Sequence, residues 1–317
     1  MSALLEVNNI SKSYQLPSRL LGTTTECILS EISFELESGK ILAVVGESGS
    51  GKSTLARQVV NLEQPDSGEI FLDGNPFVSV PDIHQRVRMI FQNPAAALNP
   101  RKRVYQLLDE PLKNLRNLSS SERSELIFQS LDHVGLDEDQ AQRYPHMLSG
   151  GQRQRIAIAR AIILNPQVIV ADEAVSALDV SVQAQILNLI MDLRDDMGMS
   201  WLFITHDISV VKVMADTVLV LYAGRVMEMG SVKQVLESPL HPYTRKLLQS
   251  VPGVDSTGNE VVAIDIKSVS SLKSPDGPAC AYLARCPIAD EACAESIPPM
   301  MNVEKHWVAC LKARQSP

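Results

Sequence analysis

The segment Gly46 to Ser53 (GESGSGKS) constrains this chain more than any other part of its sequence. It fits the pattern G-x-x-x-x-G-K-[ST], follows the apolar run 41–45 (ILAVV) and precedes a segment, 54–62, that can form a helix. Glycines let consecutive backbone N–H groups curl around phosphate oxygens, the lysine reaches the β- and γ-phosphates, and the following hydroxyl ligates Mg²⁺. The sequence therefore predicts a nucleotide site made by Gly46, Glu47, Ser48, Gly49, Ser50, Gly51, Lys52, Ser53 and Thr54.

Two later apolar runs also end in polar residues. The run 168–171 (VIVA) leads into Asp172-Glu173, and the run 201–204 (WLFI) leads into Thr205-His206-Asp207. Between them, residues 181–195 carry apolar side chains at helical spacing. Alternating buried strands and helices predict an α/β fold with a parallel, doubly wound core, in which ligands bind at the carboxyl ends of the strands.

Other segments predict structure around this core. Residues 69–75, with an Asp-Gly turn, and residues 217–229, with a turn near Ala223-Gly224, suggest an antiparallel β layer beside the parallel sheet. Residues from about 95 to 165 are mostly helical by period, and their polar segment LSSSERSE can cap a helix. We expect a helical subdomain there.

Composition excludes several classes of protein. The 317 residues carry 29 Lys+Arg and 37 Asp+Glu, a net charge of −8, and 45% are hydrophobic, as in ordinary globular proteins. The acidic balance and 4% aromatic content argue against a nucleic acid partner. No apolar stretch is long enough for a membrane helix, and the first residues lack the features of a signal peptide. A cytosolic chain is therefore expected.

A second motif narrows the class of nucleotide-binding protein. Residues 148–152 (LSGGQ) precede an expected helix from Arg153, and the run that ends in Asp172-Glu173 comes next. In this order, the motifs resemble those of ABC-type ATPase domains. The resemblance implies ATP as the nucleotide, Mg²⁺ as its metal and hydrolysis as the reaction.

The resemblance also implies roles for single residues. Tyr14 resembles the aromatic residue that stacks on adenine, although residues 15–27 lengthen the loop behind it. Gln92 resembles the glutamine that contacts Mg²⁺ and the attacking water, near the transmembrane partner. Asp172 resembles the carboxylate that holds Mg²⁺ through water, so that Ser53, Gln92 and Asp172 would form the metal site. Glu173 resembles the general base, and His206 the histidine that binds the γ-phosphate.

The signature Ser149, Gly150, Gly151 and Gln152 is expected to act on a different nucleotide. In the family this segment closes over the ATP held by another domain, so the protein would work as a dimer. A serine and two glycine N–H groups at a helix start suit contact with a γ-phosphate. Residues 176–179 (SALD) resemble the loop that couples the two halves. Ala174 stands where such domains commonly have proline, which affects the stiffness of the turn.

The last part of the chain differs in composition. From about residue 240 the composition changes, and seven prolines between residues 242 and 299 interrupt any long element, which predicts a separate, irregular appendage. The segments HPYT at 241–244, NPRKRV at 99–104 and RYPHMLSGGQRQRIAIAR at 143–160 resemble the ATP-binding subunits of dipeptide and oligopeptide importers. The expected division is an ATPase domain over 1–240 and a Cys-containing extension over 241–317.

Four of the five cysteines lie within the last 38 residues, with the spacing C-x5-C-x6-C-x16-C. They could be separate packing thiols. They could bind Zn²⁺, with His306 as a possible replacement ligand, although the C-x2-C pairs typical of structural zinc are absent. A [4Fe–4S] cluster is the preferred hypothesis, because uneven gaps can still bring four sulfurs around a cube, and the tail cysteines of the resembled family point the same way. The ligands would be Cys280, Cys286, Cys293 and Cys310, while Cys27 would be an ordinary thiol.

Taken together, the sequence predicts an ATP-hydrolysing subunit of an ABC importer for dipeptides or oligopeptides, peripheral on the cytoplasmic face of the inner membrane. The resemblance implies a second, homologous ATPase, two transmembrane permease subunits and a solute-binding protein as partners. Other solutes, namely nickel chelates, glutathione or antimicrobial peptides, stay open. The contrasting class is a soluble ABC ATPase without a transporter. A third possibility makes the cysteines a redox sensor for the ATPase.

Overall fold

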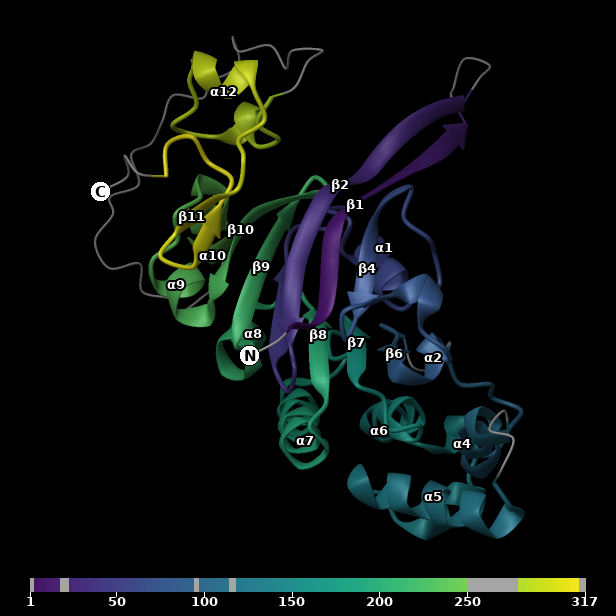
Figure 1. The fold of residues 1–317 in the computed structure, drawn as a ribbon. Coiled ribbons are helices and arrows are strands. Elements are labelled where there is room, and N and C mark those ends of the chain that lie inside the picture. The colour runs from purple at the N-terminus through teal and green to yellow at the C-terminus, as the bar shows by residue number, and fades with distance from the viewer. Residues whose placement is uncertain (1–2, 18–22, 94–96, 114–117, 250–278, 314–317) are drawn as a thin grey trace.

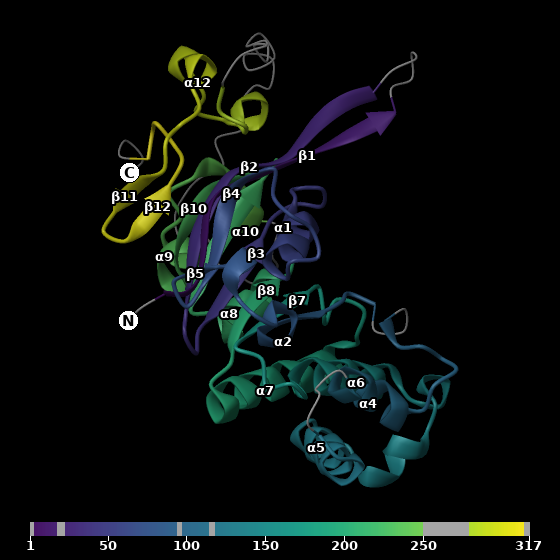
Figure 2. The same ribbon diagram turned by 45° about the vertical axis from the view of Figure 1, so that its right-hand side comes forward.

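The computed structural model describes residues 3–17, 23–93, 97–113, 118–249 and 279–313. Two sheets and a group of helices make up the fold (Figures 1 and 2). Residues 250–278, which include part of the expected C-terminal extension, lie outside the described residues.

The larger sheet has eight strands in the order β11-β12-β10-β9-β3-β8-β7-β6. Its five strands from β9 to β6 are parallel, and the other three are antiparallel. Every residue of β3, β7 and β8 is buried, because these apolar strands have layers on both faces. The strands are β3 (Ile41–Val45), β6 (Val87–Ile90), β7 (Val168–Asp172), β8 (Ser200–Ile204), β9 (Thr217–Tyr222), β10 (Arg225–Ser231), β11 (Met301–Val303) and β12 (His306–Val308).

The smaller sheet is antiparallel, with the order β2-β1-β4-β5. An apolar cluster fills the space between the two sheets and includes Leu5, Phe34 and Leu55. The far end of the β1–β2 hairpin projects away from the rest of the chain in both views (Figures 1 and 2). The strands are β1 (Ala3–Pro17), β2 (Thr23–Glu37), β4 (Ser67–Leu72) and β5 (Asn75–Pro76).

Helices cover the other face of the large sheet and extend beyond its β6 edge (Figure 2). Helices α4 to α7 share one apolar cluster with the sheet, which contains Leu107, Ile156 and Trp201. A capping box begins α5, since Ser119 and Glu122 each bond the other's backbone N–H, as LSSSERSE predicts. The helices are α1 (Lys52–Val59), α2 (Ile83–Arg86), α4 (Val104–Lys113), α5 (Ser120–His133), α6 (Gly150–Ile162), α7 (Val180–Met197), α8 (Ile208–Met214), α9 (Val232–Glu237), α10 (Pro242–Gln249) and α12 (Glu291–Glu295), with 3-10 turns at Phe77–Ser79, Glu138–Gln142, Pro145–Met147 and Leu283–Arg285.

The expected α/β fold with a parallel core is confirmed, but two expectations were wrong. Residues 217–229 do not form part of a separate β layer: β9 and β10 continue the central sheet. The reason is visible in β9 (TVLVLY), whose four central residues are all buried and therefore need layers on both faces.

The C-terminal part is also not a separate, irregular appendage. Strand β12 pairs with β10, which brings Trp307 opposite Met229, and Ala309 donates its N–H to the carbonyl oxygen of Met227 over 2.8 Å. Tyr282 and Cys286 belong to the same apolar cluster as Val45 of β3. The described part of this segment is thus packed onto the sheet. Among the described helices, none has the length and apolar character needed to cross a bilayer.

Candidate functional site

The loop between β3 and α1 has the backbone geometry of a phosphate cradle. A Cβ atom on Gly46 would lie 2.1 Å from the carbonyl oxygen of Leu221, so only glycine fits there. Gly49 and Gly51 have φ values of +79° and +102°, in the left-handed region that favours glycine. The glycines of the motif are therefore required by the path of the loop.

Lys52 lies along this loop with 7% of its surface exposed. Its Nζ donates to the carbonyl oxygens of Gly46 at 2.8 Å and Glu47 at 2.9 Å. Burial lowers the pKa of Lys52, while the charges of Glu173 and Asp172 oppose that change. Contacts with the loop's own carbonyls thus hold a cation beside the segment that is expected to bind phosphate.

Asp172, the last residue of β7, faces the start of α1. Only 8% of its surface is exposed. Burial raises its pKa, the charge of Glu173 adds to the rise, and a hydrogen bond with Ser53 opposes it. The Oδ1 atom of Asp172 is buried without a hydrogen-bond partner among the described residues. A buried, unpartnered carboxylate oxygen close to a serine hydroxyl is a donor set that suits Mg²⁺ and its bound waters.

Three predicted residues meet at the ends of neighbouring parallel strands. Gln92 follows β6, Glu173 follows β7 and His206 follows β8. Gln92 donates its Nε2–H to Glu173 Oε2 over 2.8 Å, and His206 Nδ1 lies 3.3 Å from Glu173 Oε1. The structure therefore places the side chains of Gln92 and His206 against the carboxylate of Glu173.

The backbone of Glu173 is strained to achieve this position. Its φ is +48°, uncommon for a residue with a side chain. Its N–H donates to the carbonyl of Ile204 at 3.0 Å, and its own carbonyl accepts from the N–H and the hydroxyl of Ser176. These bonds hold the Glu173 carboxylate at the edge of the sheet.

Tyr14 lies beside the far end of α1. Its hydroxyl donates to Glu63 Oε2 over 2.6 Å and accepts a longer contact of 3.5 Å from Arg57. Arg57 also donates to Thr54 over 3.1 Å, which links this tyrosine to the helix that follows the phosphate loop. The expected stacking of Tyr14 on adenine stays a prediction.

The LSGGQ signature forms the start of α6, and it packs against α7. Ser149 and Gln152 make a capping box, with N–H to side-chain contacts of 3.2 and 3.0 Å. A Cβ atom on Gly151 would lie 2.6 Å from Val182 Cγ1, so glycine permits this close packing. Within the described chain, no hydrogen bond or ion pair joins residues 149–152 to residues 46–54. The signature is thus built separately from the phosphate loop of its own chain.

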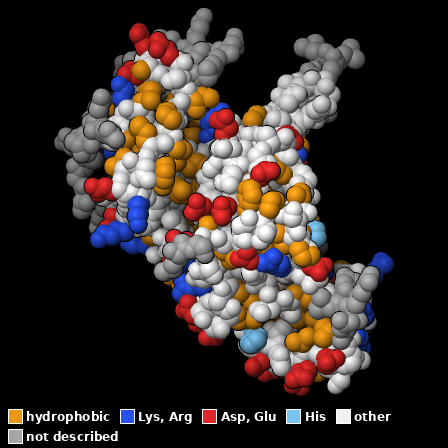
Figure 3. All heavy atoms as spheres, in the orientation of Figure 1, with side chains coloured by type: hydrophobic (Ala, Val, Ile, Leu, Met, Phe, Trp, Pro, Cys, Tyr) orange, Lys and Arg blue, Asp and Glu red, His pale blue; other side chains and the backbone are white. Residues whose placement is uncertain are grey.

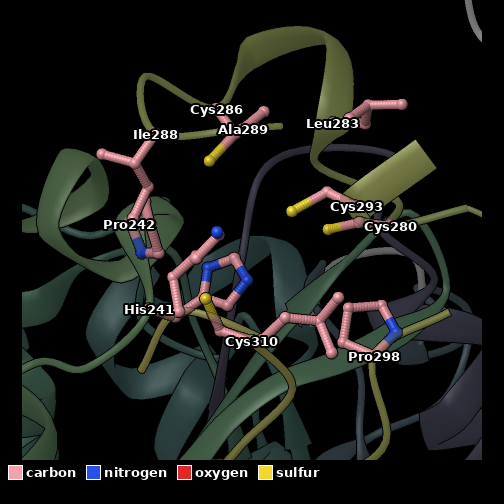
Figure 4. A pocket seen from close by; sticks show the side chains of 12 residues that line it. His241, Pro242, Cys280, Leu283, Cys286, Ile288, Ala289, Cys293, Pro298 and Cys310 are labelled. Carbon is pink, nitrogen blue, oxygen red and sulfur yellow. The ribbon is translucent and has the colours of Figure 1, made fainter. Parts of the chain in front are cut away.

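The four C-terminal cysteines line one small cavity, shown in Figure 4. Their side chains converge on it from different segments, and its other walls are mainly apolar, with His241 and Leu283 among them. Burial raises the pKa of Cys286 to about 11, and it raises the pKa of the other three thiols as well. All four ligands proposed from the sequence, Cys280, Cys286, Cys293 and Cys310, are therefore brought together.

No described group of three or more His, Cys, Asp or Glu side chains is arranged to hold a metal ion. His306, the alternative zinc ligand, is turned to another partner: its Nε2 lies 2.6 Å from Glu228 Oε1. Cys27 lies far off in the β1–β2 pair, exposed, where its thiol contacts the carbonyl of Leu29. Its interpretation as an ordinary thiol is consistent with this place.

One contact of the nucleotide site was not predicted from the sequence. The side chain of Arg285, beside Cys286, forms an ion pair with Glu47 of the phosphate loop. The two residues are 238 positions apart, and the sequence signalled this contact only by an arginine next to a cysteine of the spaced set.

On the face seen in Figure 3, basic side chains are interspersed with acidic ones and form no continuous basic surface.

Known proteins resemble both parts of the chain. A family model described as ABC transporter matches residues 29–176, and one described as Oligopeptide/dipeptide transporter, C-terminal region, matches residues 227–293. The chain is 45% identical over 323 residues to the Di/tripeptide transport ATP-binding protein DppF of Pseudomonas aeruginosa (strain UCBPP-PA14), with 99% of each chain covered. It is 40% identical over 318 residues to the Oligopeptide transport ATP-binding protein AppF of Bacillus subtilis (strain 168), covering 97% of this chain and 96% of that one.

A solved structure shares the nucleotide-binding part. It is the dimeric post-hydrolysis state of the ATP-binding cassette MJ0796 bound to ADP and Pi, with 28% identity and a TM-score of 0.64 over 72% of this chain and 98% of that one. With a P-loop, a separate signature helix and a matching C-terminal region, the chain belongs to the ABC transporter family of ATPases, in the group of dipeptide and oligopeptide transport ATP-binding proteins.

Proposed function

We propose that this chain hydrolyses ATP to drive the import of dipeptides or oligopeptides. It would lie on the cytoplasmic face of the inner membrane, beneath two transmembrane permease subunits, and pair there with a second, homologous ATPase. A solute-binding protein would deliver the peptide from outside. The names of the relatives and the match of the C-terminal region support peptides as the solute.

The observation that carries hydrolysis is the position of Glu173. Its carboxylate is held between Gln92 and His206, one strand away on either side, and beside Lys52. A carboxylate fixed there can orient a water and accept its proton, which is the main demand of phosphoryl transfer to water. Gln92 and His206 keep the carboxylate aimed, and His206 can also donate to the γ-phosphate.

The phosphate loop and Lys52 would hold the triphosphate through backbone N–H groups and the ammonium group. Ser53, Gln92 and Asp172 would hold Mg²⁺, and the unpartnered oxygen of Asp172 fits that role. When bound, Mg²⁺ supplies positive charge that offsets the charge of the phosphates. The adenine would stack on Tyr14.

The signature would bind the ATP of the partner ATPase. The capped start of α6 offers Ser149 and the N–H groups of two glycines, and no described bond commits them to the loop of their own chain. Two chains would then enclose two nucleotides, and loss of a γ-phosphate would remove the link between them. The loop 176–179 lies between Glu173 and α7, where it can transmit this change.

Glu173→Gln in the assembled transporter tests the proposal. We expect phosphate release to fall about 10²- to 10⁴-fold, because the amide cannot accept a proton. ATP should still bind, and the ATPase pair should stay closed. Asp195→Asn, on the exposed end of α7, serves as the control and should hydrolyse ATP at the normal rate. Phosphate release by Glu173→Gln at the normal rate would remove Glu173 from the mechanism.

The solute is tested separately, because it need not touch this chain. Purification of the chain from membranes should yield permease subunits, and ATP hydrolysis in reconstituted vesicles should rise with a dipeptide on the binding-protein side. A response to nickel chelates, glutathione or antimicrobial peptides instead would reassign the solute. Failure to copurify with any membrane protein would favour a soluble ABC ATPase.

We further propose that the four clustered cysteines hold a [4Fe–4S] cluster with a structural role. The four thiols line one apolar cavity, which places four candidate cluster ligands around a single space. Burial alone keeps them neutral, so a bound cluster would stabilise their thiolate form. Zn²⁺ is the alternative, but one tetrahedral ion needs four ligands within about 2.3 Å of a point. In a [4Fe–4S] cluster each thiolate would instead bind a different iron, so the four sulfurs need not meet around one ion.

Iron and sulfide analysis of anaerobically purified protein tests this. Wild type and Cys27→Ser should contain about four irons per chain and absorb visible light, whereas Cys310→Ser should lose both properties. Zinc in place of iron would select the alternative, and neither metal would leave four packing thiols.

A further inference from the structure

One residue of the phosphate loop is held by the C-terminal part of the chain. Arg285 donates to both carboxylate oxygens of Glu47: Nη1 lies 2.7 Å from Oε2, and Nη2 lies 2.9 Å from Oε1. Such paired bonds fix the guanidinium and the carboxylate in one plane as well as in distance. Arg285 lowers the pKa of Glu47 through this contact, so the carboxylate stays charged.

A second C-terminal residue holds the backbone of the same loop position. The hydroxyl of Tyr243, in α10, accepts the N–H of Glu47 over 3.0 Å. Tyr243 is 1% exposed, and burial raises its pKa to about 12, so it remains a neutral phenol. Residues outside the ATPase motifs therefore hold both the main chain and the side chain of Glu47.

Aromatic rings fix the arginine in turn. Tyr222, Tyr243 and Tyr282 pack together with ring centroids 4.6 to 5.4 Å apart. The guanidinium of Arg285 lies 5.7 Å from the ring centre of Tyr222 and 5.9 Å from that of Tyr282. Cation–π contact of this kind restricts a side chain that would otherwise sample many rotamers. The arginine is thus pre-positioned toward the loop.

Glu47 also contacts Lys52, the lysine that is expected to bind phosphate. The carbonyl oxygen of Glu47 accepts a hydrogen bond from Lys52 Nζ. A change in the path of the backbone at Glu47 therefore changes the position of Lys52. Without a cation beside it, the Glu47 carboxylate would also add negative charge close to a bound triphosphate.

We propose that Arg285 is a positioning residue for ATP: it holds the phosphate loop in its binding conformation and neutralises Glu47. This deepens the proposed ATPase function, on which it rests, and it assigns to the C-terminal segment a part in nucleotide affinity. Because Arg285 precedes Cys286, a rearrangement of the cysteine segment reaches the phosphate loop through one peptide bond and one side chain.

ATP affinity of the purified full-length chain, in the presence of Mg²⁺, tests the proposal. Arg285→Ala should raise the Kd for ATP about 3- to 10-fold, as expected for a bidentate, half-exposed pair. Arg285→Lys should give an intermediate value, because a lysine restores the charge but not the paired geometry. In the assembled transporter, KM for ATP should rise while kcat stays within about twofold.

A double-mutant cycle separates this role from a general loss of structure. If Arg285 acts through Glu47, Arg285→Ala should change the Kd much less in a Glu47→Gln background than in the wild type. An equal effect in both backgrounds, or no effect in either, would overturn the proposal. ATP hydrolysis without peptide transport would contradict only the proposed transport function.

Lys312→Ala is the matched control. Lys312 forms an ion pair with Asp290 in the same C-terminal segment, and that pair does not touch the phosphate loop. The Kd of the Lys312→Ala variant for ATP should equal that of the wild type. Thermal unfolding of both variants without nucleotide should show similar stability; equal loss of ATP affinity in both would assign the effect to the stability of the segment.

Discussion

The nucleotide site and the cysteine cavity lie on the same central sheet, and they are assembled in different ways. The first collects residues that follow neighbouring parallel strands, β3, β8, β7 and β6. Because parallel strands end at one edge, their terminal residues meet without any further device. The second is lined mainly by the C-terminal segment that β12 joins to β10, and its cysteines lie in loops and a short helix.

The nucleotide site and the cysteine cavity also differ in the chemistry of their side chains. In the nucleotide site, Lys52 and the Glu173 carboxylate already have hydrogen-bond partners within the protein. In the cavity, apolar walls surround thiols whose ionisation is opposed by burial. Sheet topology thus brings the strand-end residues of the first site together, with Arg285 and Tyr243 added at Glu47, whereas the whole of the second site depends on contacts that attach its segment to the sheet.

Gly46→Ala is expected to have the largest effect on the nucleotide site. The added Cβ would lie 2.1 Å from the carbonyl oxygen of Leu221, which belongs to the backbone of β9 and cannot move independently. The phosphate loop must shift instead, and we expect the Kd for ATP to rise at least about 100-fold, or roughly 2.7 kcal/mol. Equilibrium binding of ATP measures this change.

Gly198→Ala is the control for adding a methyl group to a glycine. Gly198 ends α7 with φ +67°, and no atom lies within 4 Å of its Cβ position. The left-handed backbone should cost about 1 kcal/mol of stability, while ATP affinity stays unchanged. Normal ATP binding by Gly46→Ala would show that the loop tolerates the shift. The backbone of β9 would then not fix the conformation of the phosphate loop.

Glu228→Ala tests the attachment of the C-terminal segment to the sheet. The Glu228 carboxylate in β10 is fully buried and accepts from the N–H groups of Leu240 and His241 at 2.7 and 3.0 Å, besides its contact with His306. Its removal leaves two buried groups, on His241 and His306, and the partly buried N–H of Leu240 without this partner. We expect the free energy of unfolding to fall by about 3 kcal/mol.

Chemical denaturation measures this loss, with Glu237→Ala as the control. Glu237 ends α9 and is exposed, so its removal should change stability by less than about 0.5 kcal/mol. If Glu228→Ala were as stable as Glu237→Ala, the segment would be attached to the sheet by other contacts.

Much of the nucleotide site could be predicted because its residues stand next to strand ends in the sequence. An apolar run followed by a polar residue places that residue at the ligand edge once the sheet is parallel, as for Asp172, Glu173 and His206. The motif pattern needs only local spacing, and it identified the loop 46–53 directly. These parts of the site require no long-range knowledge.

The C-terminal contacts could not be predicted in this way. The turn between β11 and β12 uses Glu304 and Lys305 at φ values of +55° and +65°, and neither residue type signals a hairpin. The pair of Glu47 and Arg285 joins distant positions through an aromatic cluster that periodicity does not reveal. The prolines predicted an irregular C-terminal segment, although this segment contributes two strands, β11 and β12, to the large sheet.

The smallest expected effect joins the two regions. Cys286→Ser changes the residue that follows Arg285, and it should raise the Kd for ATP about 2- to 3-fold by loosening the hold of Arg285 on Glu47. In an Arg285→Ala background the same substitution should add nothing, because the connecting side chain is already absent. Glu237→Ala, at the exposed end of α9, should leave the Kd unchanged. ATP titration of these four variants against the wild type measures the connection. An equal effect of Cys286→Ser with and without Arg285 would mean that the cysteine segment reaches the nucleotide by another route, and no effect in either background would mean that the two regions act independently.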